Sequence, residues 1–196
     1  VGSMLAYWLA ELGQKNIIGL EKSTIIPSDI ASTAHASDFV YNTTHDKLGC
    51  WATNFSRNFY EENGFFLKKG GLEICRKDDD ARWEELKRKV ESGKAFGTNI
   101  RLISAAEAKE KFPLLDEESI RGAMWDPDAG LVTPRSQDVV NFAVETAKET
   151  GALKTYTDTP AIGFEIENGR IVGVKTDKGI IKTKKVVIAS GIWGPL

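Results

Sequence analysis

The sequence has few of the residues that build disulfide frameworks and metal sites. Its 196 residues include two cysteines, two histidines and two methionines. Cys50 and Cys75 form no CxxC motif and do not have the spacing of zinc ligands. We therefore expect two free thiols, a reducing compartment and no metal site. That compartment is the cytoplasm or, in a eukaryote, the mitochondrial matrix.

Long hydrophobic runs and a charge excess are also absent. No apolar segment is long enough to span a membrane, and no signal peptide is expected, because residue 1 already falls inside a predicted helix. The formal net charge of -2 argues against nucleic acid or an anionic membrane as the main partner. With 41% hydrophobic and 28% charged residues, the composition instead indicates a globular chain with a sizeable core.

The beginning of the chain predicts a helix followed by a buried strand. Residues 2 to 13 have the periodicity of a helix, and residues 16 to 21 form a nearly continuous apolar run that is typical of a parallel strand. On the helix we expect an inner face of leucines beside small alanines: Leu5, Leu9, Leu12, Ala6 and Ala10. No strand precedes this helix, and the chain stops soon after residue 189, so we expect a piece of a larger protein.

The middle of the chain predicts a mixture of helices and strands. A loop rich in Ser, Thr, Asp and Ala spans residues 23 to 45, and loops of this length are usually functional. Ser104 and Glu107 form the capping-box pattern of a helix start. The expected elements are helices at 47–62, 79–92 and from 105 to just before Pro113, and strands at 65–67, 71–75, 101–103 and 120–125.

The last third of the chain predicts one helix and a set of strands. Thr133 and Pro134 are typical of the N-cap and first residue of a helix. Asn168 and Gly169 predict a tight hairpin between two strands. A buried strand is expected at residues 185–189, where an apolar run from Val186 to Ala189 follows Lys185.

The order of these elements predicts the domain organisation. Residues 1–44 and 131–196 form two α/β blocks, and residues 45–130 form a mixed β/α insert between them. Inserting a substrate domain into a Rossmann-type domain is a common way to build such a chain. The sequence therefore predicts an α/β fold with a discontinuous nucleotide-binding domain and part of a substrate-binding domain.

Gly2 and Glu21 have the spacing of a dinucleotide-binding site. A glycine at the start of a helix lets phosphate groups approach its N–H groups, and Gly2, preceded by Val1, could be the last glycine of such a fingerprint. Glu21 ends the strand about 20 residues later, where an acid binds the ribose hydroxyls and repels a 2′-phosphate. Each residue also has a structural interpretation, as a helix-start glycine and an exposed strand-end carboxylate, but their spacing favours the site.

The segment Ala31–Ala36 carries a histidine among small residues and hydroxyls. Ser32 and Thr33 offer donors to phosphate oxygens. The ring of His35 is neutral and nucleophilic near neutral pH. A histidine is unusual in a dinucleotide loop, so it indicates a flavin and suggests a flavin bonded to the protein. A lone loop histidine is more often simply solvated, and this is our interpretation of His45.

With these residues the sequence resembles the dimethylglycine and sarcosine dehydrogenase/oxidase family of D-amino-acid-oxidase-like flavoproteins. The resemblance covers the chain in order through six motifs: Leu20-Glu21-Lys22, Ala31–Ala36, Gly70-Gly71-Leu72-Glu73, Phe112–Asp116, Asp126–Leu131 and Val187–Gly194. It implies a Rossmann-like FAD-binding domain of the glutathione-reductase type, without its first strand, over 1–44 and 131–196. Residues 45–130 would then belong to the substrate-binding domain.

The resemblance also implies which residues contact FAD. His35 matches a histidine that is joined covalently to the 8α-methyl group of the flavin. The other implied contacts are Val1 and Gly2 for the pyrophosphate, Glu21 and Lys22 for the adenosine half, Ser32, Thr33, Ala34 and Phe39 for the flavin or its phosphates, and Ala161 for adenine. The sequence departs from the family at Ala31, where glycine is usual, and at Asp38, where glycine is frequent. A carboxylate at Asp38 would disfavour the reduced, anionic flavin.

The activity implied by the resemblance is oxidation of N-methyl groups of small amino acids, with hydride transfer to FAD. Oxygen or an electron-transfer flavoprotein would accept the electrons, and a folate-dependent domain could be fused or associated. The alternatives are a hydroxy-acid or glycerol-phosphate dehydrogenase of the same fold and a non-catalytic regulatory subunit. No catalytic residue is named, because the family's substrate-side residues lie beyond residue 196, and we interpret Tyr41 and Trp51 as core residues. The chain alone is expected to bind FAD weakly and to have no turnover.

Overall fold

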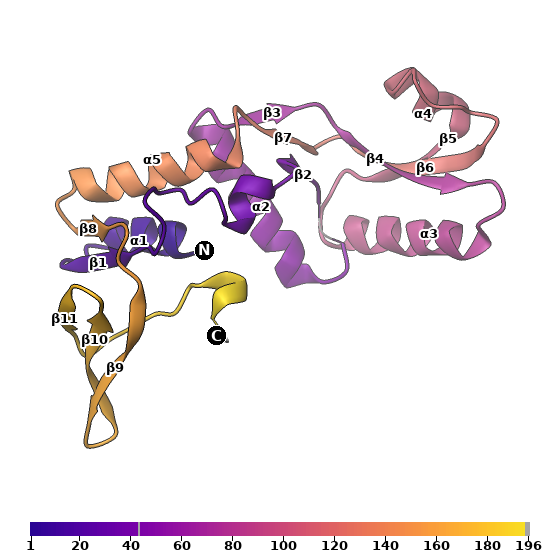
Figure 1. The fold of residues 1–196 in the computed structure, drawn as a ribbon. Helices are drawn as coiled ribbons and strands as arrows, with labels where there is room; N and C mark the ends of the chain where they lie inside the picture. The colour runs from indigo at the N-terminus through magenta and orange to yellow at the C-terminus, as the bar shows by residue number, and fades with distance from the viewer. Residues whose placement is uncertain (43, 195–196) are drawn as a thin grey trace. The chain divides into compact units, whose positions relative to one another are not determined.

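The computed structural model describes residues 1–42 and 44–194, which form two compact units (Figure 1). Unit 1 consists of Val1–Ala36 and the chain from Arg135 onward, and unit 2 consists of Ser37–Pro134. Both units contain helices and strands. Unit 1 has a parallel and an antiparallel sheet and unit 2 has antiparallel sheets, so the predicted α/β class is confirmed. The assignment of the units to cofactor and substrate stays a prediction.

Unit 1 is built on a parallel pair of strands that packs against two helices. Helix α1 (Gly2–Glu11) leads to β1 (Ile17–Leu20), which pairs with β8 (Leu153–Tyr156). Helix α5 (Ser136–Glu149) packs against α1 and supplies the crossover that a parallel pair requires. The core between them is formed mainly by small side chains: Ala10, Val144, Ala147, Ala152 and Leu153.

The inner face of α1 is centred on its alanines, so the predicted leucine face was wrong at Leu12, while Leu5 and Leu9 are half-buried. Ala10 is buried and Ala6 packs against the core, whereas Leu12 is 82% exposed. The reason is the neighbouring helix. Because α5 packs directly on α1, methyl side chains at the contact let the two helix backbones approach closely.

The rest of unit 1 consists of two short 3₁₀ turns and a β-meander. Turn η1 (Ser32–His35) contacts α5, and turn η2 (Gly191–Trp193) lies near the end of the chain. Strands β9 (Ala161–Glu167), β10 (Arg170–Thr176) and β11 (Gly179–Lys182) form an antiparallel sheet with β10 in the middle. Asn168 and Gly169 both have positive φ in the β9–β10 turn, which confirms the predicted hairpin.

Two sequence-based predictions near unit 1 were wrong. Residues 185–189 form no strand, and Val187 and Ile188 are 66% and 62% exposed, because no strand among the described residues pairs with this segment. Helix α5 begins at Ser136, after the predicted cap at Thr133. The backbone N–H of Thr133 donates to the carbonyl of Phe65 at 2.9 Å, which keeps this residue in the extended chain that follows β7.

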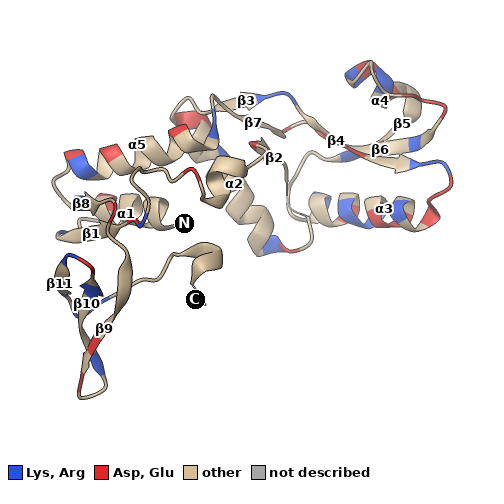
Figure 2. Cartoon of the chain, viewed as in Figure 1, with Lys and Arg blue, Asp and Glu red and all other residues tan. Residues whose placement is uncertain are grey.

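Unit 2 contains two antiparallel sheets of three strands. One has the order β2 (Phe39–Val40), β7 (Gly130–Val132), β3 (Phe66–Lys68), and the other β4 (Gly71–Arg76), β6 (Ile120–Asp126), β5 (Arg101–Ser104). The helices are α2 (Lys47–Glu62), α3 (Asp80–Ala95) and α4 (Ala105–Lys111). Leu86 and Val90 of α3 are buried, as the sequence predicted, while acidic and basic residues alternate over the rest of α3 (Figure 2).

Candidate cofactor site

The start of α1 is closely approached by the segment that precedes η2. A Cβ atom on Gly2 would lie 3.2 Å from the Cβ of Ala189, so a larger residue at position 2 would displace one of the two segments. The N–H groups in the first turn of a helix have no partner within the helix, and Val1 before them is 98% exposed. A small residue at position 2 therefore lets the segment before η2 lie close to the first turn of α1.

The carboxylate of Glu21 is held just beyond the end of β1. Its backbone N–H donates to the carbonyl of Tyr156 at 2.9 Å, which continues the β1–β8 pairing by one residue. Its Oε1 atom accepts a hydrogen bond of 2.8 Å from the N–H of Ser23. The N–H of Thr159 donates to the Glu21 carbonyl at 3.0 Å. The chain that leads to Ala161, the first residue of β9, therefore starts beside Glu21.

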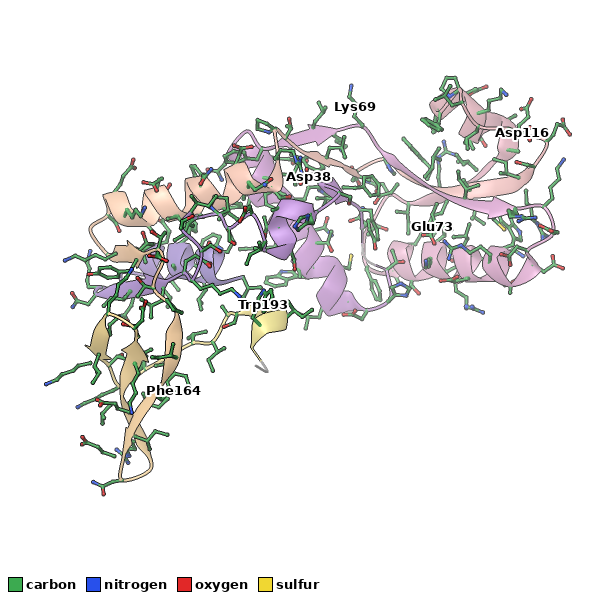
Figure 3. All side chains as sticks on the ribbon, in the orientation of Figure 1. Asp38, Lys69, Glu73, Asp116, Phe164 and Trp193 are labelled. Atoms are coloured by element: carbon green, nitrogen blue, oxygen red, sulfur yellow. The ribbon has the colours of Figure 1, made fainter. Side chains whose placement is uncertain are left out.

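Lys22 contacts Trp193, a contact that the sequence analysis did not predict. Its Nζ atom lies 3.5 Å from the centroid of the Trp193 ring, in the cation–π range. Trp193, labelled in Figure 3, belongs to the Gly-Ile-Trp-Gly motif near the end of the chain. Two motifs that carry the family resemblance therefore meet here, and no local pattern in the sequence indicates this contact.

The histidine segment forms a single 3₁₀ turn in place of the predicted loop. The N–H of Ala34 donates to the carbonyl of Ala31 at 2.9 Å, which closes the turn. Thr33 and Ala34 are half-buried, and Ser32 and His35 are exposed. Over the part of the chain that the structure describes, the side chain of His35 makes no hydrogen bond or ion pair. Its ring nitrogens are therefore open to a ligand.

Phe39 belongs to unit 2, unlike the other predicted cofactor residues, and Asp38 lies beside it. Asp38, also labelled in Figure 3, has a φ of 61°, a backbone conformation that glycine adopts without strain and that aspartate tolerates. A positive φ at this position agrees with the glycine that the family resemblance leads us to expect there. The ring of Phe39 lies 5.7 Å from that of Tyr41, centroid to centroid, and a Cβ atom on Gly71 would come within 2.6 Å of it.

Two of the open hollows on the described part of unit 2 differ in chemical character. The first is polar, has a volume of about 330 Å³ and is lined by Thr44, His45, Glu85, Arg88, Lys89 and Ser92. The second is largely aromatic, has a volume of about 340 Å³ and lies between β2 and α2. Tyr41 lines the second hollow and is 56% exposed, and Trp51 is 59% exposed, so the interpretation of both as core residues was wrong.

The comparison with protein families identifies the chain. The family model described as FAD dependent oxidoreductase, DAO, matches residues 1–196. The chain belongs to the DAO family. The sequence-based resemblance to D-amino-acid-oxidase-like flavoproteins is therefore confirmed.

None of the helices over residues 1–42 and 44–194 is long and apolar enough to cross a membrane.

Curated relatives of this DAO-family chain are longer proteins of low identity. Human mitochondrial sarcosine dehydrogenase is 26% identical over 206 residues, which are 98% of this chain and 22% of that protein. Human mitochondrial dimethylglycine dehydrogenase is 26% identical over 200 residues, with the same coverage. The mouse mitochondrial pyruvate dehydrogenase phosphatase regulatory subunit is 27% identical over 200 residues, again 98% of this chain and 22% of that protein. The chain spans about a fifth of the length of each.

Solved structures of DAO-type enzymes share the fold. L-proline dehydrogenase from P. horikoshii superposes with a TM-score of 0.89 at 34% identity, over 100% of this chain and 51% of that chain. Glycine oxidase from Bacillus cereus superposes with a TM-score of 0.80 at 28% identity, over 99% of this chain and 53% of that chain. The chain therefore corresponds to about half of each of these enzymes, and the predicted Rossmann-like architecture is confirmed.

Proposed function

We propose that this chain is the FAD-binding part of an amine oxidoreductase that oxidises N-methyl groups of small amino acids, such as dimethylglycine or sarcosine. The observation that carries the proposal is the position of Glu21. Its carboxylate is held at the end of β1, in the same unit as the start of α1 and the exposed His35. The names of two relatives, sarcosine dehydrogenase and dimethylglycine dehydrogenase, support the substrate class.

The residues of unit 1 suit the two halves of FAD. When bound, FAD supplies the acceptor for a hydride that leaves the N-methyl carbon. The N–H groups at the start of α1 would bind the pyrophosphate, and the carboxylate of Glu21 would accept hydrogen bonds from the ribose hydroxyls. The remaining proposed contacts are Val1, Gly2, Lys22, Ser32, Thr33, Ala34 and Ala161 in unit 1 and Phe39 in unit 2.

His35 is proposed as the covalent anchor of the flavin. The bond would join a ring nitrogen to the 8α-methyl carbon of the flavin, replacing a C–H bond whose proton leaves, while its two electrons reduce the flavin and pass on to the electron acceptor. It needs a ring nitrogen that no protein group occupies, and the exposed ring of His35 meets this condition among the described residues. A covalent bond would keep the flavin from dissociating. Of the two residues that replace family glycines, Asp38 adopts the positive φ that glycine would supply, so this substitution leaves the backbone conformation intact.

A second candidate is a non-catalytic regulatory subunit, because one curated relative is named as a regulatory subunit. Its 27% identity over 98% of this chain is no lower than that of the dehydrogenases. The two candidates differ in whether bound flavin is reduced by an amine. The electron acceptor, oxygen or an electron-transfer flavoprotein, and a folate-dependent domain belong to the proposal for the catalytic candidate.

Anaerobic flavin reduction tests the proposed function. The full-length protein that carries this chain is mixed without oxygen with dimethylglycine, sarcosine, L-proline or a hydroxy acid, and the flavin absorbance is followed. We expect dimethylglycine or sarcosine to bleach the flavin faster than the other two compounds. Faster bleaching by L-proline or by the hydroxy acid would show that the proposed substrate class is wrong. Bound flavin that no compound reduces would favour the regulatory subunit.

A further inference from the structure

Asp126 is a buried carboxylate that the proposed function does not use. It ends β6, is 4% exposed and begins the Asp126–Leu131 motif of the family resemblance. A carboxylate loses its hydrating water when it is buried, so its oxygens need hydrogen-bond donors from the protein. The described residues alone bury Asp126, and the donors that it binds belong to unit 2. They therefore show what this motif does within the unit.

Asn42 donates two hydrogen bonds to this carboxylate. It follows β2 and is 3% exposed. Its backbone N–H donates to Oδ2 of Asp126 at 2.7 Å, and its Nδ2 atom donates to Oδ1 at 2.9 Å. The N–H of Asp128 donates to Oδ1 at 3.0 Å. Hydrogen bonds to a carboxylate are roughly twice as strong as those between neutral groups. Because β2 and β6 belong to different sheets, this pair ties one sheet of unit 2 to the other.

Arg57 of α2 sets the orientation of the Asn42 amide. Its Nη1 atom donates to Oδ1 of Asn42 at 3.4 Å, and its Nη2 atom donates to Oδ1 of Asn54 at 2.5 Å. The amide of Asn42 therefore accepts from a cation on one side and donates to the carboxylate of Asp126 on the other. An amide side chain offers both a donor and an acceptor, as this position requires. Arg57, Asn42 and Asp126 thus form one series that connects α2, β2 and β6.

The same motif holds the ring of Phe39 at the start of β2. A Cβ atom on Gly71 would lie 2.6 Å from Cζ of Phe39 and 3.0 Å from Cβ of Ala129, so the glycine leaves the space that this ring occupies near Ala129. Strand β2 also pairs with β7, which follows Ala129. Gly71 belongs to the Gly70–Glu73 motif and Ala129 to the Asp126–Leu131 motif. Two motifs of the resemblance to which the proposed function gives no role therefore hold β2 in place.

We propose that Asp126 is a positioning residue, which fixes β2 through Asn42 and so sets where the ring of Phe39 meets the flavin. The proposal rests on the proposed function, because Phe39 is a proposed FAD contact there. Asn42 lies just after β2, so a displacement of its backbone passes along the strand to the ring of Phe39. In this scheme Asp126 touches neither FAD nor the substrate and acts only through the position of β2.

Exchanging the two side chains isolates their hydrogen bonds from the rest of the core. D126N sets an amide NH₂ group against a donor of Asn42, so it should break the pair. The double variant N42D/D126N should restore the pair with donor and acceptor exchanged, because Arg57 still faces the carboxylate at position 42. D128N is the matched control. It makes the same isosteric change in the same motif, but the carboxylate of Asp128 pairs with Lys68 of β3.

Amide hydrogen exchange of residues 38–42 in the full-length protein measures how firmly β2 is held. We expect D126N to raise the exchange rate by about ten-fold or more, which is the effect of losing a hydrogen bond to a buried charged group. The double variant should return the rate most of the way to that of the wild type, and D128N should leave it unchanged. N42A removes only the side-chain bond and gives the same comparison, with a smaller rise, should D126N fail to fold.

The visible absorbance band of bound flavin separates positioning from simple stabilisation, because the band responds to the groups around the flavin ring. We expect D126N to shift the band, the double variant to restore it and D128N to leave it unchanged. A band that stays unchanged in D126N, an unchanged exchange rate at residues 38–42, or no recovery in the double variant would overturn the inference.

These outcomes are distinguishable from a failure of the proposed function, because neither measurement uses an amine. If the band and the exchange rate change as expected but dimethylglycine and sarcosine do not reduce the flavin, the role of Asp126 stands and the proposed substrate class is wrong. If these amines reduce the flavin but D126N leaves its band unchanged, the proposed reaction stands and the inference is wrong. A wild type without flavin would overturn both.

Discussion

Lys89 on α3 lies between two glutamates in a mostly buried position. Its Nζ atom is 2.6 Å from Oε1 of Glu73 and 3.1 Å from Oε1 of Glu85, and its side chain is 12% exposed. Burial opposes the charged form of Lys89, but the hydrogen bonds and charges of the two glutamates outweigh burial and raise its pKa. The hydrogen bond and charge of Lys89 in turn lower the pKa of Glu85.

Replacing Lys89 by methionine should destabilise unit 2. The carboxylate of Glu73 would lose a charged partner in a position where water screens charge poorly, so we expect the free energy of unfolding at pH 7 to fall by about 1–3 kcal/mol. The control is K87M, because the ion pair of Lys87 with Glu84 is exposed and should contribute less than about 0.5 kcal/mol. Urea unfolding measures both values, and equal losses would contradict the assigned role of Lys89.

The stability difference between the wild type and K89M should depend on pH at both ends of the range. The pKa of Lys89 is raised above its ordinary value of 10.5, so its contribution is complete below pH 10.5 and is lost as the pH rises through the folded-state pKa. The pKa of Glu85 is lowered below its ordinary value of 4.5, so its contribution is lost as the pH falls through the folded-state pKa. Urea unfolding over this range should show a plateau that declines on both sides. A difference that stays constant would show that these groups do not titrate as described.

Gly70 combines a positive φ of 76° with a ring against its Cα atom. A Cβ atom there would collide with the Trp125 ring, so G70A should lower the free energy of unfolding by about 2–4 kcal/mol, from backbone strain and overpacking together. Gly64 is the matched control. Its φ is 75°, but its surroundings are open, so G64A should cost about 1 kcal/mol from strain alone. If urea unfolding gives the same loss for both variants, the contact with Trp125 does not contribute to the cost of G70A.

At the scale of elements, three helices of unit 2 begin at a residue whose side chain accepts a backbone hydrogen bond. The caps are Asp46 for α2, Asp79 for α3 and Ser104 for α4. In α4 a second hydrogen bond runs in the opposite direction: Oε2 of Glu107 accepts a hydrogen bond of 3.0 Å from the N–H of Ser104. This confirms the capping box that the sequence predicted.

The capping box should matter because α4 has only seven residues. Replacing Ser104 by alanine removes the bond to the N–H of Glu107, and we expect a loss of about 1 kcal/mol in the free energy of unfolding. Replacing it by threonine keeps a hydroxyl acceptor and should cost clearly less. Amide hydrogen exchange in α4 measures the local effect. If S104A and S104T exchange alike, the hydroxyl is not the cap.

Local signals predicted elements well, and contacts between distant segments explain the errors. The Asn168-Gly169 hairpin and the Ser104 cap depend on a few adjacent residues, and both were predicted correctly. A strand at 185–189 depends on a partner elsewhere in the chain, and the inner face of α1 depends on its contact with α5. Neither partner can be derived from periodicity alone.

At the scale of the whole molecule, the predicted cofactor residues divide between the two units. Most of them lie in unit 1, where hydrogen bonds connect Glu21 with Tyr156 and with the chain that leads to β9. Phe39 lies in unit 2 and lines the largely aromatic hollow between β2 and α2. The family resemblance predicted these positions, but it did not predict the contact of Lys22 with Trp193 or the positive φ of Asp38, because both depend on three-dimensional structure.

The central claim is that this DAO-family chain carries FAD and that His35 anchors it. Acid precipitation of the full-length protein, followed by flavin absorbance of pellet and supernatant, tests both parts directly. We predict flavin in the pellet for the wild type and in the supernatant for H35A. Flavin that stays in the pellet with H35A would remove His35 from this role, and colourless fractions from the wild type would contradict the claim that the chain binds FAD.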